Sequence, residues 1–178
     1  MSTTAAGVLL AAGAGTRFGM PKVLAAQGAW LRAAVDALAT GGCGDVVVVL
    51  GAAIVEVPSP ARAVVADCWS DGLSVSLRTG LSAVDADYAV VHTVDTPDVG
   101  AEVVRRVLDA ALTSSSGLAR AHYADGPGHP VVIAREHWPA LLRVLGGDEG
   151  ARPFLAARDD VVVVDCADLA TGRDIDVP

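Results

Sequence analysis

The chain has 178 residues, of which 52% are hydrophobic and 4% aromatic, and its formal net charge is −8. This negative charge argues against nucleic acid or an anionic membrane as a partner, because both require a basic face. No apolar run reaches the roughly 18 residues of a membrane span, and the N-terminus lacks the pattern of a signal peptide. We therefore expect a cytoplasmic protein with a single domain over residues 1–178.

The three cysteines, Cys43, Cys68 and Cys166, are odd in number and show no CxxC spacing. Neither a disulfide framework nor a zinc site is indicated. We expect each of them to be a small, buried apolar residue.

Apolar runs alternate with segments of helical periodicity along the whole chain. Short, continuous apolar runs predict strands that are covered on both faces, and apolar residues spaced by three and four predict helices. The predicted strands cover residues 5–12, 45–50, 63–66, 88–93, 118–123, 130–134 and 161–164. The predicted helices cover residues 30–40, 73–84, 101–111, 138–145 and 150–157. This alternation predicts an α/β fold with a doubly wound, mostly parallel, Rossmann-like sheet.

The first predicted strand ends in a glycine-rich loop. Gly13, Gly15 and Gly19 let the backbone approach a ligand closely, and the N–H groups of such a loop form an anion-binding concavity. Arg17 provides a fork that grips phosphate oxygens, and Lys22 provides a compact point charge. Lys22 is the only lysine among the 13 basic residues, which indicates a specific chemical demand at this position.

The loop fits other glycine motifs poorly. Its spacing is GxGxxxG, and the strand at residues 45–50 ends in Gly51 with no acid to hold a ribose. No GK[ST] sequence follows, so the loop is not a Walker motif, and a Tyr-xxx-Lys pair is impossible with Lys22 as the single lysine. A purely structural turn is the alternative.

Carboxylates occupy two positions suited to a metal. Asp95 follows the strand at residues 88–93, at the sheet edge where such folds bind ligands, and Mg²⁺ prefers oxygen donors. A capping or turn role is the alternative, for which Asp98 is the better candidate. Asp174 and Asp176 alternate on the C-terminal tail, so one of them would complete the site if the tail folds back. A solvated acidic tail is the alternative.

Several polar residues have two interpretations. Ser74 and Ser76 lie at the start of a predicted helix, where they would bind a ribose or base edge or else cap the helix. His129 lies in a Gly-His-Pro segment within the predicted loop at residues 124–129. It is either a site residue or a turn residue. His92 lies within a strand and is expected to be structural.

Taken together, these motifs resemble the MobA-like nucleotidyltransferases, and within them most closely the molybdenum cofactor cytidylyltransferase branch. The signature is Leu-Ala-Ala-Gly-x-Gly-x-Arg-Phe-Gly-x-Pro-Lys at residues 10–22. Further matching segments follow in order at residues 72–81, 95–97, 128–131, 147–152 and 174–178. The similarity therefore extends over nearly the whole chain.

The resemblance implies a fold of the nucleotide-diphospho-sugar transferase type and a Mg²⁺-dependent transfer of a nucleoside monophosphate from an NTP, with release of pyrophosphate. For the cytidylyl branch it implies CTP and molybdopterin carrying molybdenum as substrates, and a recipient molybdoenzyme or its chaperone as a further partner. Such transfer depends on positioning and charge neutralisation and needs no covalent nucleophile.

The resemblance also implies roles for individual residues. The catalytic residues would be Lys22, Arg17 and Asp95, and the metal would be held by Asp95 and Asp176. The nucleotide would be bound by Leu10, Ala11, Ala12, Gly13, Ala14, Gly15, Thr16, Arg17, Lys22, Gly72, Ser74 and Ser76. The acceptor would be bound by His129, Asp148 and Arg152.

Some segments depart from the cytidylyl pattern. Residues 11–13 read Ala-Ala-Gly rather than the Ala-Gly-Gly of the guanylyl branch, which favours CTP, but residues 93–97 read Thr-Val-Asp-Thr-Pro, nearer the guanylyl wording. Residues 28–31 lack the usual proline-containing run, so acceptor contacts would differ. The chain stops at Pro178, where relatives continue into an acidic residue and a helix.

Three other functions stay open. A guanylyltransferase of the same fold would use GTP. Similar sequences are named nicotine blue oxidoreductases, which use a nicotinamide cofactor, but the missing ribose-binding acid argues against this function. A non-catalytic regulator or carrier would bind an NTP without releasing pyrophosphate, and the combination of Lys22 with Asp95 argues against it.

Overall fold

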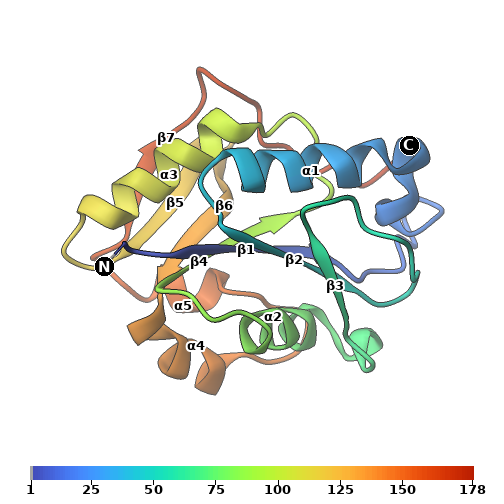
Figure 1. Cartoon of the computed structure of the whole chain (residues 1–178), viewed down its shortest axis with the longest axis horizontal. Helices are drawn as coiled ribbons and strands as arrows, with labels where there is room; N and C mark the ends of the chain where they lie inside the picture. Colours follow the sequence, from blue (N-terminus) through green and yellow to red (C-terminus); the bar gives the residue numbers. More distant parts are fainter. Residues whose placement is uncertain (1) are drawn as a thin grey trace.

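The computed structural model describes residues 2–178 as an α/β domain around one seven-stranded sheet (Figure 1). The strands are β1 (Ala5–Ala11), β2 (Asp45–Leu50), β3 (Arg62–Val65), β4 (Tyr88–Thr93), β5 (Leu118–Tyr123), β6 (Gly126–Ala134) and β7 (Val162–Asp165). The α-helices are α1 (Ala29–Thr40), α2 (Leu73–Ser82), α3 (Ala101–Thr113), α4 (Trp138–Val144) and α5 (Arg152–Ala156). Short 3₁₀ segments cover Lys22–Gly28, Trp69–Asp71 and Arg135–His137. No helix within residues 2–178 is long and apolar enough to cross a membrane.

The sheet is mostly parallel, as predicted. Its strand order is β3-β2-β1-β4-β6-β5-β7, and every neighbouring pair is parallel except the two pairs that contain β6. Because β1 and β4 are parallel neighbours, their carboxyl ends meet at the same edge of the sheet. The glycine-rich loop after β1 and Asp95 after β4 are thereby brought together.

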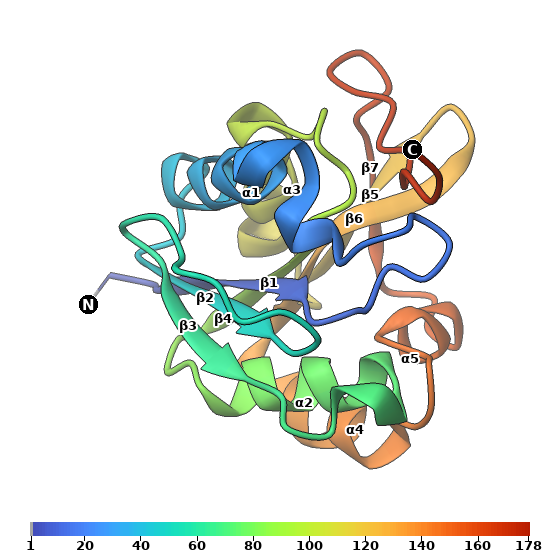
Figure 2. The same cartoon turned by 90° about the vertical axis from the view of Figure 1, so that its right-hand side faces the viewer.

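Helices cover both faces of the sheet, with α1 and α3 on one side and α2, α4 and α5 on the other (Figures 1 and 2). Alternate residues of β1 point to opposite faces. Leu9 packs in the cluster that contains Val35 of α1, whereas Val8 packs in the cluster that contains Leu77 of α2. Since both faces are buried, the central strands are almost wholly apolar, which is why their positions were readable from the sequence.

Two local expectations were wrong. The predicted loop at residues 124–129 is mostly strand, because β6 begins at Gly126 and pairs with both β4 and β5. His129 therefore lies in β6 rather than in a turn. Pairing of Gly126 and Pro127 with Tyr123 and His122 of β5 extends the strand beyond its predicted start at residue 130. Among the cysteines, Cys43 and Cys166 are buried, whereas Cys68 is exposed in the turn before the Trp69–Asp71 segment.

The packing of α2 on β1 depends on Gly80. A Cβ built on Gly80 would lie 2.4 Å from Cγ1 of Val8, a stiff side chain in the middle of β1. We expect Gly80→Ala to lower the free energy of unfolding by about 1–3 kcal/mol, because overpacking outweighs the gain in helix propensity. Urea denaturation would measure it. Gly44→Ala is the control, since no heavy atom lies within 4 Å of that Cβ, and equal midpoints for the two variants would contradict the packing argument.

Candidate active site

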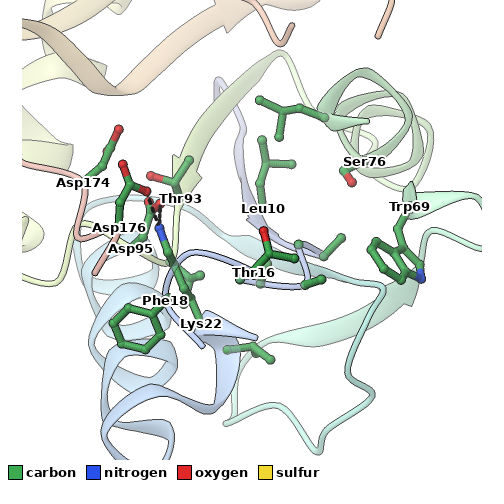
Figure 3. A pocket seen from close by; sticks show the side chains of 18 of the residues that line it. Leu10, Thr16, Phe18, Lys22, Trp69, Ser76, Thr93, Asp95, Asp174 and Asp176 are labelled. Carbon is green, nitrogen blue, oxygen red and sulfur yellow. Dashed lines mark hydrogen bonds and ion pairs between the residues drawn. The ribbon is translucent and has the colours of Figure 1, made fainter. Parts of the chain in front are cut away.

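A cavity of about 530 Å³ opens at the carboxyl ends of β1 and β4. The glycine-rich loop forms one wall, the segment from Trp69 to Ser76 forms another, and Asp95 faces them with the C-terminal tail (Figure 3). All but two of the predicted site residues line it, namely Leu10, Ala11, Ala12, Gly13, Ala14, Gly15, Thr16, Arg17, Lys22, Gly72, Ser76, Asp95, His129, Asp148 and Asp176. The predicted residues thus converge, although they come from all parts of the chain.

Different structural reasons account for the individual glycines of the loop. Gly15 has φ +63°, and its Cβ would lie 1.8 Å from the carbonyl oxygen of Met20, so the turn itself requires glycine. The turn is closed by the amide of Gly19, which donates to the carbonyl of Gly15 at 2.8 Å. Gly13 has no heavy atom within 4 Å of its Cβ position, so it leaves open space beside the cavity. Such space lets a ligand approach the backbone.

Lys22 is the centre of the polar wall. Its Nζ donates to Oδ2 of Asp95 at 2.9 Å and to Oδ1 of Asp176 at 2.8 Å, and its side chain is only 15% exposed (Figure 3). Burial lowers the pKa of Lys22, but hydrogen bonds and charge attraction from Asp176 and Asp95 outweigh this effect and raise it above its ordinary value. Lys22 is therefore a fixed cation.

The C-terminal tail folds back onto the site. The amide of Ile175 donates to the carbonyl of Asp95 at 2.9 Å, and Asp176 also lies 3.6 Å from Nη2 of Arg17. Earlier in the tail, the amide of Thr171 donates to Oδ2 of Asp98 at 2.7 Å. Asp98 thus fixes the tail instead of capping α3, whose N-cap residue is Gly100. Figure 2 shows the tail beside the loop that follows β1.

The carboxylates fit a hard divalent cation. Oδ1 of Asp95 is buried and has no hydrogen-bond partner among the described residues. The pKa of Asp174 is raised by loss of solvent and then by the negative charges of Asp95 and Asp176, so the tail brings a third carboxyl near the same point. Residues 2–178 contain no group of three or more acidic, His or Cys side chains placed to hold a metal ion. A divalent cation at Asp95 would therefore need further oxygen ligands from water or from substrate phosphates, which Mg²⁺ commonly takes.

A second cavity of about 390 Å³ adjoins the first. Residues shared by the two linings are Leu10, Leu73, His129, Asp148 and Asp174. Arg152, predicted for the acceptor, lines only the second cavity. Burial lowers the pKa of His129 to about 4, so its imidazole is neutral at physiological pH.

Ser74 is the other predicted residue that lies outside the first cavity. Its buried hydroxyl donates to the carbonyl of Gly147 at 2.7 Å and so ties α2 to the loop before α5. The proton of this hydroxyl is therefore already donated within the protein, and its predicted contact with a nucleotide stays a prediction. Gly72 requires glycine for the same junction, since it has φ +119° and its Cβ would lie 2.3 Å from the Gly147 carbonyl oxygen.

Several lining residues were not predicted, among them Trp69 and Arg120. Trp69 faces the first cavity opposite the acidic residues (Figure 3), and its signal was an aromatic residue next to a matched motif in a chain with few aromatics. Arg120 of β5 lines the second cavity, and its signal was a charged residue within an otherwise apolar run.

Comparison with known proteins identifies the family. The sequence model of the MobA-like NTP transferase domain matches residues 7–161. The chain belongs to this family. Rv0371c from Mycobacterium tuberculosis H37Rv is similar in structure, with a TM-score of 0.81 at 27% identity over 99% of this chain and 95% of that protein. A complex of Rv0371c with manganese has a TM-score of 0.69 at 27% identity and covers 97% and 94% of the two chains.

The family assignment confirms the fold and supports nucleotidyltransferase activity with an NTP as substrate. One similar protein is named as an oxidoreductase rather than as a transferase. Nicotine blue oxidoreductase from Paenarthrobacter nicotinovorans is 37% identical over 185 residues, which cover 96% of this chain and 91% of that protein. The name of the family and the name of this relative describe different reactions, and one fold can host different reactions.

The position of the tail depends on Gly172. This residue has φ +63°, and a Cβ there would lie 2.2 Å from Cε2 of Tyr123. We expect Gly172→Ala to loosen the tail and to raise hydrogen exchange at the Ile175 amide about tenfold or more, because the positive φ alone costs about 1–2 kcal/mol. Exchange measured by NMR would test it. Gly146→Ala is the control, having open space around its Cβ, and unchanged protection at Ile175 in Gly172→Ala would refute the proposed anchoring.

His92, on β4, makes the protein sensitive to acid. It is fully buried, neither ring nitrogen has a partner within residues 2–178, and burial, followed by His129, lowers its pKa to about 3. The unfolded chain binds the proton near pH 6.5, so stability is complete above that value and falls as pH decreases towards 3.

Through His92, the unsubstituted protein should lose about 2 kcal/mol of unfolding free energy between pH 7.5 and pH 5. We expect His92→Leu to lack this loss. Urea denaturation at both pH values measures this difference. His122→Leu controls for removal of one titratable side chain, since His122 is only half-buried on β5. The same pH dependence in His92→Leu and in the unsubstituted protein would show that another group is responsible.

Proposed function

We propose that the protein transfers CMP from CTP to the phosphate of a molybdopterin-type acceptor, with Mg²⁺, and releases pyrophosphate. One observation carries this proposal. The single lysine of the chain is held between Asp95 and Asp176, facing a glycine-rich loop at the carboxyl ends of β1 and β4. A fixed cation, open backbone N–H groups and paired carboxylates are what a triphosphate with its metal requires.

The residues of the first cavity would have separate roles in the transfer. The backbone of Gly13 and Gly15, together with Arg17, would hold the triphosphate, and Lys22 would neutralise charge as it develops on the α-phosphate. Asp95 and Asp176 would hold Mg²⁺, which supplies further charge neutralisation. An oxygen of the acceptor phosphate forms a bond to the α-phosphorus, and the bond to the bridging oxygen breaks, so pyrophosphate leaves with that electron pair.

The second cavity supports the acceptor assignment. It adjoins the first through neutral His129 and Asp148, and Arg152 lies on its wall. An acceptor bound there would have its phosphate next to the nucleotide. A recipient molybdoenzyme or its chaperone would take the product in the cytoplasm.

A nicotinamide-dependent oxidoreductase is the second candidate, favoured by the 37% identity with the nicotine blue enzyme. The end of β2 argues against the usual mode of dinucleotide binding. A Cβ on Gly51 would lie 2.6 Å from Cβ of Trp69 and 2.7 Å from the carbonyl oxygen of Ala12, so no acidic side chain fits where a ribose would be held.

Ligand-dependent melting distinguishes the candidates. We expect Mg²⁺ with CTP to raise the melting temperature more than Mg²⁺ with GTP, ATP or UTP, because a ligand that binds the native state stabilises it by mass action. A preference for GTP would move the protein to the guanylyl branch. A shift with NADPH and none with any NTP would reject the transferase and favour the oxidoreductase.

Turnover separates an enzyme from a nucleotide carrier. We expect Lys22→Met and Asp95→Asn each to reduce pyrophosphate release in the presence of molybdopterin by about 100-fold or more, because each removes charge stabilisation in the transition state. Arg32→Met is the matched control, since it removes an exposed cation on α1 whose guanidinium donates only to the Gln27 carbonyl. Binding of CTP without any pyrophosphate release by the unsubstituted protein would indicate a carrier.

A further inference from the structure

Arg120 is a half-buried cation that has no partner within the described chain. It lies in the middle of β5, paired in register with Val131 of β6 and Val163 of β7, and its side chain lines the second cavity. Its Nε is buried and makes no hydrogen bond to any of residues 2–178. Apolar side chains form much of the surrounding wall, namely Leu77, Val91, Val131 and Leu155.

Most other arginines have a partner within residues 2–178. Besides half-buried Arg120, the exceptions are Arg143 and Arg152, which are exposed. Exposed arginines pair with aspartates, as Arg62 does with Asp45 and Arg106 with Asp168. Others donate to backbone carbonyls, as Arg105 does to Thr40. Within residues 2–178 Arg120 makes neither kind of contact, so no structural role accounts for a guanidinium at this place.

No carboxylate is paired directly with Arg120. Asp148, Glu149 and Asp174 line the same cavity, but no ion pair within 4.0 Å joins any of them to Arg120. Arg152 lines it as well, and the pKa of Arg120 is lowered by burial and by the positive charge of Arg152. A cation taken partly out of water, beside a second cation, is destabilising unless an anion joins them.

We propose that Arg120, with Arg152, binds a phosphate dianion in the second cavity, and that this dianion is the phosphomonoester group of the acceptor. The assignment of the anion to an acceptor rests on the proposed transferase function. A planar guanidinium binds two phosphate oxygens at once, which makes arginine suited to this task. Arg120 does not line the first cavity, where Lys22 and Arg17 face the triphosphate, so the nucleotide's own phosphates have separate cations.

The site also places the anion usefully for transfer. The two cavities share His129 and Asp148, so a phosphate held by Arg120 lies beside the nucleotide cavity. One of its remaining oxygens attacks the α-phosphorus, and pyrophosphate departs as already described. Arg120 would therefore act as a specificity residue that admits phosphorylated acceptors and rejects their dephosphorylated forms.

The test uses phenyl phosphate as a phosphomonoester probe, with inorganic pyrophosphate and Mg·CTP as comparisons, in isothermal titration calorimetry on the full chain. We expect Arg120→Met to weaken phenyl phosphate binding tenfold or more, while Mg·CTP and pyrophosphate bind within twofold of the unsubstituted protein. Arg120→Lys retains the charge and should recover part of the affinity. Arg105→Met, on the opposite face of the sheet, is the matched control and should bind phenyl phosphate normally.

Folding is checked in the same series. Because Arg120→Met removes an unpaired, half-buried charge, its melting temperature without ligand should equal or exceed that of the unsubstituted protein. A variant that melts lower would assign Arg120 a structural role and overturn the proposal.

The remaining outcomes are distinct. Absence of phenyl phosphate binding in the unsubstituted protein, or equal binding in Arg120→Met, rejects the anion site even if Mg·CTP binds and the transferase stands. Loss of pyrophosphate binding with phenyl phosphate retained assigns Arg120 to the nucleotide and also rejects the acceptor site. Binding of phenyl phosphate through Arg120 with no binding of Mg·CTP supports the anion site and rejects the proposed transferase.

Discussion

The ion pairs of Lys22 with Asp95 and Asp176 are the contacts on which the site depends. They join the loop after β1, the end of β4 and the C-terminal tail, and Lys22 and Asp176 are 154 positions apart in the sequence. Arg17 also lies 3.6 Å from Asp176, so two cations face these two carboxylates, and Asp174 adds a third carboxyl group nearby. Since like charges at short range are costly, a further cation would stabilise these carboxyl groups. The same cluster joins three distant parts of the chain and, in the proposed function, would hold the divalent ion.

The two adjoining cavities differ in how they meet negative charge. The first combines loop N–H groups, Arg17 and Lys22 with carboxylates, as a phosphate chain with its metal requires. The second has apolar walls and Arg120, with no carboxylate paired to that arginine among the described residues. Asp148, Glu149 and Asp174 also line the second cavity, so the proposed phosphomonoester would depend on direct contacts with Arg120 and Arg152 rather than on the net charge of the lining.

Much of the fold was predictable because burial determines which residue types a strand contains. Strands covered on both faces are continuous apolar runs, so their positions followed from pattern, and the rule for parallel sheets placed the loop after β1 beside Asp95. Partners distant in sequence left no such pattern. Nothing local showed that Ser74 would bond to Gly147, that Asp98 would bond to Thr171, or that β6 would insert antiparallel between β4 and β5. The sequence shows Arg120 as a charged residue inside an apolar strand. That it has no partner within residues 2–178 depends on three-dimensional packing, which the sequence does not show.

The similarity to an oxidoreductase makes the choice of chemistry a question about the site rather than the fold. Hydride transfer moves two electrons and a proton between apolar rings and needs no cation fixed between carboxylates. Phosphoryl transfer concentrates charge on oxygens and depends on cations held in advance. Lys22 is largely removed from water, and Asp95 keeps one oxygen buried without a partner in the described chain, which are costs that a hydride site would not recover. A bound nucleotide and metal would offset both, so the electrostatics of the site favour the transferase.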